Sequence, residues 1–310
     1  MAHTGFRRVK DLGVLPLHAV LQILKRMPEP AVRASFAAAG AAVKLGYPAP
    51  GNYARRTVRD FARVLGRDDP RAMYGETVDK VMRVAATYVQ LLRGGGERVA
   101  ASVRLAPQAE EICERLRRDT GHALFVIPHC TGSVLSAAGF GRRYPAVLLM
   151  RESRDPRRSA LTRTYLERLG PELCYARSTD ASTVTRRILQ AVRKREFVVG
   201  TTDLIRKTAD TLPARMFGQE VWLPAWPARF SARLRMPIVP AYVTVDREGI
   251  TMRFEEPYLE DDPSACTQRW ASVFEDNFRR YPTDWAFQFD KRWSKVLAIA
   301  AGTRPPSPVE

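Results

Sequence analysis

The stretch Ala123-Leu-Phe-Val-Ile-Pro-His-Cys-Thr-Gly-Ser-Val-Leu135 places an apolar run directly before a histidine and a group of small residues. The run 123–127 is bounded by Gly121 and Pro128, which is typical of a strand buried on both faces of a parallel sheet. Catalytic and ligand-binding groups of such sheets lie just beyond the carboxyl ends of the strands. His129 is therefore the first candidate for a catalytic residue. The alternative is a histidine held at the strand end by backbone hydrogen bonds.

The cysteines give little sign of a metal site or of disulfides. The four lie far apart without paired spacing, which argues against both and favours a reducing compartment. Cys130 follows His129 directly, but neighbouring side chains on an extended segment point apart, so this pair is poorly arranged for a nucleophile and its base. We expect no metal and no bound cofactor.

Positive charge is the strongest compositional feature. The formal net charge is +17, and the segment 139–235 alone holds 20 Arg or Lys against 9 Asp or Glu. Such a field attracts acidic lipid headgroups, an acidic carrier protein or phosphorylated small molecules. No recognition helix, zinc-finger spacing or aromatic RNA-binding signature accompanies the charge, so we expect no nucleic-acid partner. Alternatively, many of the arginines simply keep helix faces in solvent.

The N-terminal residues 1–96 are predicted to form a helical, membrane-surface extension. The apolar run Leu12 to Leu24 is interrupted by Pro16 and His18 and has basic flanks. It is shorter than the roughly 20 apolar residues that span a bilayer, and no small-residue cleavage site follows it. A helix lying on an anionic membrane fits this pattern, and packing against the core fits it equally. Residues 97–300 are predicted to form one α/β domain, and 301–310 a flexible tail.

Strands and helices are expected to alternate after the triple glycine at 94–96, which we interpret as a loop. This alternation predicts βαβ units in a mostly parallel central sheet flanked by helices. The expected strands are 99–105, 123–127, 147–150, 172–176, 197–200, 238–245 and 250–254, the last two pairing side by side. The expected helices are 31–45, 54–65, 70–92, 108–117, 133–139, 157–169, 182–194, 229–235, 267–280 and 285–300.

Several short motifs in this order resemble the bacterial lipid A biosynthesis (lauroyl or myristoyl) acyltransferases of the lysophospholipid acyltransferase superfamily. The resemblance covers roughly residues 47–295, and the order and spacing of the motifs carry it. The motifs are the strand ending in His129, Arg151 with Asp155-Pro156, the helix Leu161 to Gly170, Phe197 to Asp203, Phe217-Gly218, Pro237-Ile-Val-Pro240, Tyr281-Pro282-x-x-Trp285 and Arg292-Trp293. The resemblance implies a glycerolipid or lipid A acyltransferase-like α/β fold.

In that family a histidine is followed, after four residues, by an acid. The imidazole removes a proton from the acceptor hydroxyl as it attacks an acyl thioester, and the carboxylate orients the ring. His129 matches the histidine, but Val134 stands where the family has the acid, and neither Ser133 nor Leu135 is acidic. The acid of the motif is therefore missing.

Three explanations of the missing acid stay open at this point. A carboxylate from elsewhere reaches the imidazole, with Glu152 best placed after its strand and Asp203 second. Alternatively, Ser133 or Thr131 orients His129 without an acid and the rate is lower. In the third case catalysis is lost and the protein binds acyl groups or a partner. A positioned general base contributes about 10²–10⁴ in rate, so even a weakened arrangement would serve a slow pathway.

The resemblance also implies substrate contacts, each with an alternative. Arg151 would contact the phosphate or sugar of the acceptor, or it forms a surface salt bridge with Glu152 or Asp155. Asp203 corresponds to an aspartate common in the family, or it caps a turn. Thr131 and Ser133 are also predicted to bind the substrate. Aromatic residues would line an acyl channel or belong to the core; they are Phe217, Trp222 and Trp226.

The sequence therefore predicts an acyltransferase with His129 as general base. It would move a fatty acyl group from acyl carrier protein or a coenzyme A thioester to a hydroxyl or amine of a lipid-like or glycolipid acceptor. It would act peripherally on the cytoplasmic face of the bacterial inner membrane. The alternative is a catalytically inactive protein of the same fold that binds acyl chains or scaffolds a biosynthetic complex.

Overall fold

A seven-stranded sheet forms the centre of the protein within the residues that the computed structural model describes, which are 20, 22–151, 163, 166, 172–176 and 181–305. Its strands lie in the order β1-β9-β8-β2-β5-β3-β4. Their bounds are β1 Val103–Leu105, β2 Leu124–Ile127, β3 Ala146–Arg151, β4 Glu172–Ala176, β5 Phe197–Thr201, β8 Ile238–Val245 and β9 Ile250–Phe254. Only β8 and β9 pair antiparallel among these neighbours, so the predicted mostly parallel sheet is confirmed, as is the pairing of its last two strands.

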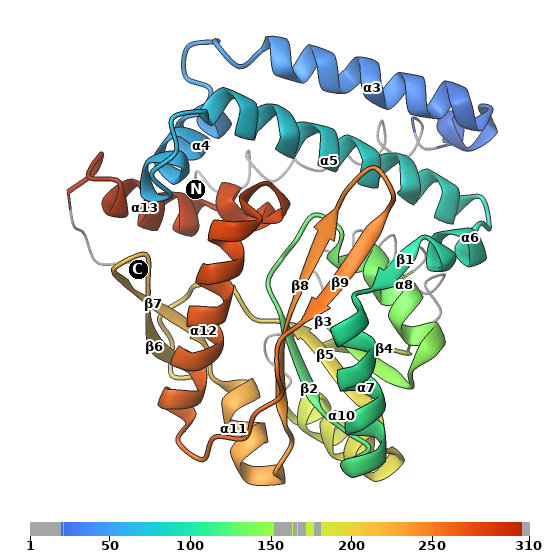
Figure 1. Ribbon diagram of the computed structural model, residues 1–310, viewed down its shortest axis with the longest axis vertical. Coiled ribbons are helices and arrows are strands. Elements are labelled where there is room, and N and C mark those ends of the chain that lie inside the picture. The colour runs from blue at the N-terminus through green and yellow to red at the C-terminus, as the bar shows by residue number, and fades with distance from the viewer. Residues whose placement is uncertain are drawn as a thin grey trace, which may run out of the picture.

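Helices flank this sheet, as the alternation in the sequence predicts (Figure 1). They are α7 Pro107–Asp119, α8 Ser133–Arg143, α10 Ala181–Lys194, α11 Trp226–Leu234 and α12 Pro263–Arg280. Every residue of β2 and of β8 is buried. Strands of this kind are covered on both faces, which explains why they appear in the sequence as continuous apolar runs.

The N-terminal part of the described chain is helical. It consists of α3 Glu29–Leu45, α4 Tyr53–Val64, α5 Pro70–Leu92 and the short α6 Gly96–Ala101. Asn52 caps α4 by accepting a hydrogen bond from the Arg55 amide, and Pro70 begins α5. Figure 1 shows α3 and α5 lying across the end of the sheet at which β8 terminates. Phe61 of α4 and Phe125 of β2 belong to one hydrophobic cluster; the domain boundary at 96/97 stays a prediction.

The strand predicted over 99–105 is wrong in its first half. Residues up to Ala101 form α6, and only Val103–Leu105 pair with β9. Val99 and Ala100 are consecutive and both buried. A Cβ added at Gly139 of α8 would lie only 2.3 Å from the Val103 Cβ, which shows how closely α8 packs here. This packing buries the apolar run as a helical turn, so tertiary contacts override the preference of Val for strands.

The helix predicted over 285–300 is also wrong in its first third. Trp285 is extended, Ala286–Phe289 form the 3₁₀ helix η3, and α13 spans Lys291–Ala300. The Asp290 carboxylate caps α13 by accepting a hydrogen bond from the Arg292 amide at 2.9 Å. A separate 3₁₀ helix, η2, covers Pro282–Asp284. The segment before α13 is therefore a compact irregular stretch that runs to the end of β2.

A hairpin formed by β6 Thr211–Met216 and β7 Gln219–Pro224 has no counterpart among the predicted elements. Its turn residues Phe217 and Gly218 both have positive φ, 52° and 73°. Two-residue hairpin turns need this conformation, which Asn-Gly or Asp-Gly usually supplies. Phenylalanine is therefore an unusual first turn residue, and its ring is 6% exposed because it packs into the aromatic core.

Candidate active site

Two neighbouring parallel strands bring His129 and Asp203 together. In the register of β2 and β5, Ile127 lies opposite Thr201, so the residues two positions beyond each strand emerge side by side at the carboxyl edge of the sheet. The His129 Nδ1 lies 2.5 Å from the Asp203 Oδ1, and the His129 amide donates to Oδ2 at 3.0 Å. One carboxylate thus holds both the ring and the backbone of the histidine.

Asp203 is enclosed by two tryptophans. Its side chain is fully buried. The Trp285 indole donates to Oδ2 at 3.1 Å, and the Trp293 indole donates to the Asp203 carbonyl oxygen at 2.6 Å. A buried carboxylate is tolerated only when hydrogen bonds replace its lost hydration. The indoles supply such bonds and fix the carboxylate against the imidazole.

The other edge of the imidazole faces outward. Phe287 stacks on the His129 ring, with 3.6 Å between the centroids and 2° between the planes, and 32% of the His129 side chain is exposed. Nδ1 is bound to Asp203, and Nε2 has no hydrogen-bond partner among the described residues. The Ala286 amide donates to the His129 carbonyl at 2.8 Å, which ties the two segments together. The imidazole is thus held by Asp203 and Phe287 and is partly open to solvent.

Thr131 and Ser133 contact the backbone of the loop that carries the histidine. The Ser133 hydroxyl accepts from the Cys130 amide at 3.0 Å and donates to the Pro128 carbonyl at 3.2 Å. The Thr131 hydroxyl donates to the Asp284 carbonyl at 3.3 Å. Both hydroxyls shape the loop, and Asp203 occupies the position next to Nδ1.

The chain as a whole matches a known protein family. The family model described as bacterial lipid A biosynthesis acyltransferase matches residues 5–295. The chain belongs to this family. The resemblance noted in the sequence is thereby confirmed, and the protein is an acyltransferase. No individual curated protein matches the chain at a significant level.

The other predicted site residues of the acyltransferase have less defined surroundings. Arg151 ends β3, but its side chain, Glu152 and Asp155 lie outside the described residues. Val134 is half-buried and packs against the hydrophobic core. We predict that its side chain faces the imidazole or packs immediately beside it.

The aromatic residues predicted for an acyl channel have different surroundings. Phe217 lies among core rings, including Trp285 at a centroid distance of 6.2 Å. Trp222 is covered by Lys207 at 4.7 Å and donates to Glu220. Trp226 packs on β5, because a Cβ added at Gly200 would lie 2.7 Å from its ring. Phe217 therefore contributes to the core.

A buried ion pair supports the histidine loop from α5. The Lys80 Nζ lies 2.6 Å from the Asp284 Oδ2, 2.8 Å from the Thr283 hydroxyl and 3.0 Å from Glu76. The Asp284 Oδ1 accepts from the Val245 amide at the end of β8, and its carbonyl accepts from the Thr131 amide, both at 2.8 Å. Burial raises the pKa of Asp284, which Lys80 opposes. This network joins α5, β8 and the loop around His129.

The sequence reasoning missed the roles of these supporting residues. Trp285 and Trp293 were noted as parts of family motifs, but nothing in one sequence indicates that their indoles converge on Asp203. Phe287 and Lys80 carry no local signal at all. A polar residue inside an otherwise apolar stretch, such as Asp284 before Trp285, is the one available hint of a buried partner.

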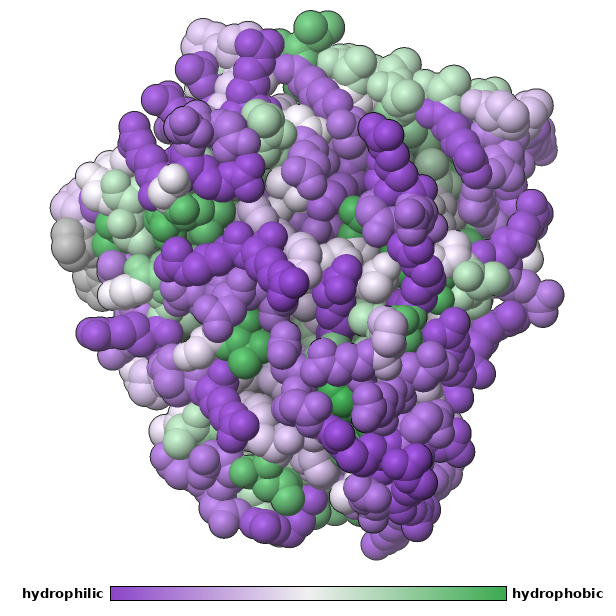
Figure 2. Space-filling model, in the orientation of Figure 1, coloured by the Kyte–Doolittle hydropathy of each residue, from purple (hydrophilic) through white to green (hydrophobic). Residues whose placement is uncertain are grey.

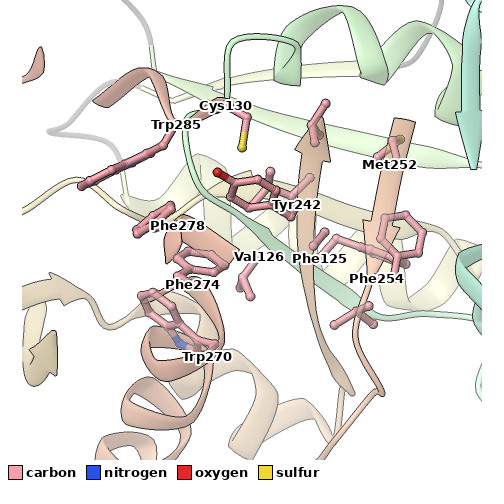
Figure 3. Packing of buried hydrophobic residues seen from close by; sticks show 14 of the residues in the cluster. Phe125, Val126, Cys130, Tyr242, Met252, Phe254, Trp270, Phe274, Phe278 and Trp285 are labelled. Carbon is pink, nitrogen blue, oxygen red and sulfur yellow. The ribbon is translucent and has the colours of Figure 1, made fainter. Parts of the chain in front are cut away.

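Cys130 points away from the reacting edge. It is 6% exposed, and Figure 3 shows its thiol directed into the buried cluster toward Tyr242. Burial raises the pKa of the Cys130 thiol well above its ordinary value, so the thiol stays protonated and unreactive at neutral pH. The position therefore suits a core residue.

We expect Cys130→Ala to retain most of its activity, with a loss far below the roughly hundredfold or greater effect of removing a catalytic base. The measurement is the initial rate of acyl transfer, together with alkylation of the native protein by iodoacetamide. Fast labelling of Cys130 with loss of activity would contradict its assignment to the core.

Proposed function

We propose that the acyltransferase moves a fatty acyl group from a thioester donor, acyl carrier protein or coenzyme A, to a hydroxyl or amine of a lipid or glycolipid. His129 is the general base and Asp203 its orienting carboxylate. The observation that carries the proposal is the 2.5 Å contact between His129 Nδ1 and Asp203 Oδ1, in a histidine whose side chain is partly exposed. Asp203 then takes the role of the acid that the family has at the position of Val134.

The chemistry follows from the two ring nitrogens. Nε2 accepts the proton of the acceptor hydroxyl while the hydroxyl oxygen attacks the thioester carbonyl carbon. The new C–O bond forms, the C–S bond breaks, and the imidazolium returns its proton to the leaving thiolate. The Asp203 carboxylate keeps the Nδ1 proton in place and stabilises the imidazolium, as in a Ser-His-Asp relay without the serine. The stacked Phe287 ring restricts the rotation of the imidazole.

Incubation of the pure protein with labelled acyl thioesters and a total lipid extract tests the proposal. The two donors, acylated acyl carrier protein and acyl-coenzyme A, are offered in separate incubations. We expect label in a lipid product in each. Mass spectrometry of lipids from a deletion strain then identifies the acceptor. Tight acyl binding without transfer to any acceptor would instead support the inactive, binding function.

Peripheral attachment to an anionic membrane belongs to the same proposal, supported by exposed apolar residues of α3. This helix has three charged residues among its 17, and Val43 and Leu45 are 41% and 79% exposed. Figure 2 shows apolar side chains along the top of the molecule, where α3 lies in Figure 1. Exposed apolar side chains of this kind can enter the interfacial region of a membrane. None of the helices in the described residues is long and apolar enough to cross a bilayer.

Replacing Leu45 with glutamate is expected to weaken binding to vesicles containing anionic lipid by about tenfold, because a buried leucine contributes about 1.5–3 kcal/mol. Leu189→Glu on α10 is the matched control, since Leu189 is also exposed, at 39%, but lies on another helix. Co-sedimentation measures both, and high salt should release much of the wild-type protein. Retention through salt and carbonate washes would contradict peripheral binding.

A further inference from the structure

A basic groove lies between α4 and α13, outside the site around His129. The two helices lie side by side in Figure 1 and enclose a volume of about 670 Å³. Its cationic lining residues are Arg56, Arg59, Arg63, Lys291, Lys295 and Arg304. The one carboxylate in the lining is Asp60, which accepts a hydrogen bond from Thr303 and lies 4.0 Å from Arg63. Positive charge therefore dominates the groove, with six cations against one anion.

Most of this charge is not neutralised within the protein. Arg56, Arg59, Lys291 and Arg304 make no ion pair with any carboxylate in the part of the chain that the structure describes. Like charges this close repel one another, so their clustering costs stability. An anionic partner from outside removes that cost, which is the usual reason for such a cluster at a concave surface.

The groove is joined to the active site by short, rigid connections. Thr57 and Ser294 share a hydrogen bond of 2.8 Å across the two helices, and Trp293 of α13 donates to the Asp203 carbonyl. Lys291 follows Phe287, the ring stacked on His129, by four residues. Four residues span at most roughly 14 Å, so a molecule bound in the groove lies close to the imidazole.

The spacing of the cations favours an extended, helical anion. On α4 they recur at 56, 59 and 63, and on α13 at 291 and 295. These are the intervals of one helix face, and 56 to 63 covers roughly 10 Å at 1.5 Å per residue. A single phosphate reaches only part of that length. A helix with carboxylates at the same intervals matches all of it.

A lipid surface fits the groove poorly. Interfacial attachment needs exposed large apolar side chains beside the basic ones. Within the lining, Tyr53 and Ala298 are the apolar contributors, and the Tyr53 hydroxyl is directed to the Phe289 carbonyl at 3.3 Å. Among the exposed large apolar side chains of the described residues, only Tyr53 lies in this lining.

We infer that the α4–α13 groove is the docking surface for a carboxylate-rich helix of the protein carrier that delivers the acyl thioester. The inference rests on the proposed function, since it assigns the donor of that reaction to a protein and gives its place of binding. The docking surface inferred here lies outside the basic segment 139–235, whose charge was the first candidate for attracting an acidic carrier protein.

The test compares Arg56→Gln/Arg59→Gln with the matched control Arg117→Gln/Arg118→Gln, which removes two exposed charges from α7. Each variant is assayed with acylated acyl carrier protein and with an uncharged acyl-N-acetylcysteamine thioester. We expect the groove variant to raise the KM for the carrier about tenfold relative to the KM for the small donor. The control should differ from wild type by less than about twofold for either donor. The carrier KM of wild type should also rise with salt.

A binding measurement separates this inference from the proposed reaction. Fluorescence anisotropy of a labelled carrier protein reports docking whether or not transfer occurs, and the groove variant should weaken it about tenfold. Equal carrier affinity in the two variants would overturn the inference. So would an equal rise in KM for acyl-coenzyme A, which indicates a phosphate site, or a loss confined to vesicle binding, which indicates a lipid surface. If carrier docking shows the expected loss but no donor supports transfer, the proposed reaction fails and the docking surface stands.

Discussion

Replacing His129 with alanine is expected to lower the rate of acyl transfer at least about a hundredfold, because a positioned general base contributes about 10²–10⁴. The side chain is partly exposed at the end of β2, so its removal should change the melting temperature little. Initial rates with a labelled thioester measure the first effect, and circular dichroism the second. If the His129→Ala variant stayed active, the catalytic assignment would be wrong and only the family fold would stand.

Asp203→Asn extends this prediction to the orienting carboxylate. An amide keeps an acceptor for the Trp285 indole but loses the charge that stabilises the imidazolium. Groups that act as one unit are not additive, so the rate should fall nearly as far as in His129→Ala, and the double variant should lose little more.

Glu152→Gln is the matched control for the other candidate carboxylate. If Asp203 orients His129, Glu152→Gln leaves the rate close to that of wild type. A silent Asp203→Asn with a damaging Glu152→Gln would exchange the two roles. A large gain of activity in Val134→Glu would show that the orienting charge is incomplete.

Lys80→Met is expected to destabilise the protein by about 3–5 kcal/mol, because it leaves the Asp284 carboxylate buried without its cation. The lysine is 12% exposed and the aspartate 1%, so water cannot easily replace the lost partner. Urea denaturation followed by tryptophan fluorescence measures the free energy of unfolding. Lys44→Met is the control, since its partner Asp79 is exposed and such a pair contributes at most about 1 kcal/mol.

The loss in free energy of unfolding caused by Lys80→Met should depend on pH. Burial already raises the pKa of Asp284, and removing the opposing lysine raises it further. A carboxyl whose folded pKa exceeds its unfolded value binds a proton on folding, so its contribution is greatest at low pH and is lost as pH rises through the folded pKa. The variant should therefore lie closer to wild type at pH 5 than at pH 8. An equal loss of stability at pH 5 and pH 8 would show that the substitution acts through packing alone.

The sequence by itself determined the central strands and the histidine at the end of one of them. Strands β8 and β9 have the predicted bounds, and β2 differs by one residue. These strands are buried on both faces or alternate clearly, so their pattern is local and can be recognised in one sequence. It also determined the family, because the order of its motifs along the chain is preserved.

Only the tertiary structure decided which residues surround His129. Asp203 reaches the imidazole because β5 lies beside β2, although the two residues are 74 positions apart in the chain. Trp285, Trp293 and Lys80 come from still other segments, which meet because α5 packs on η2, and α13 on α4 and η3. Hydrophobic periodicity specifies which face of an element is buried, but not which distant element covers it. The order of the strands and the close packing of the core therefore decide that the Asp203 carboxylate lies beside the imidazole.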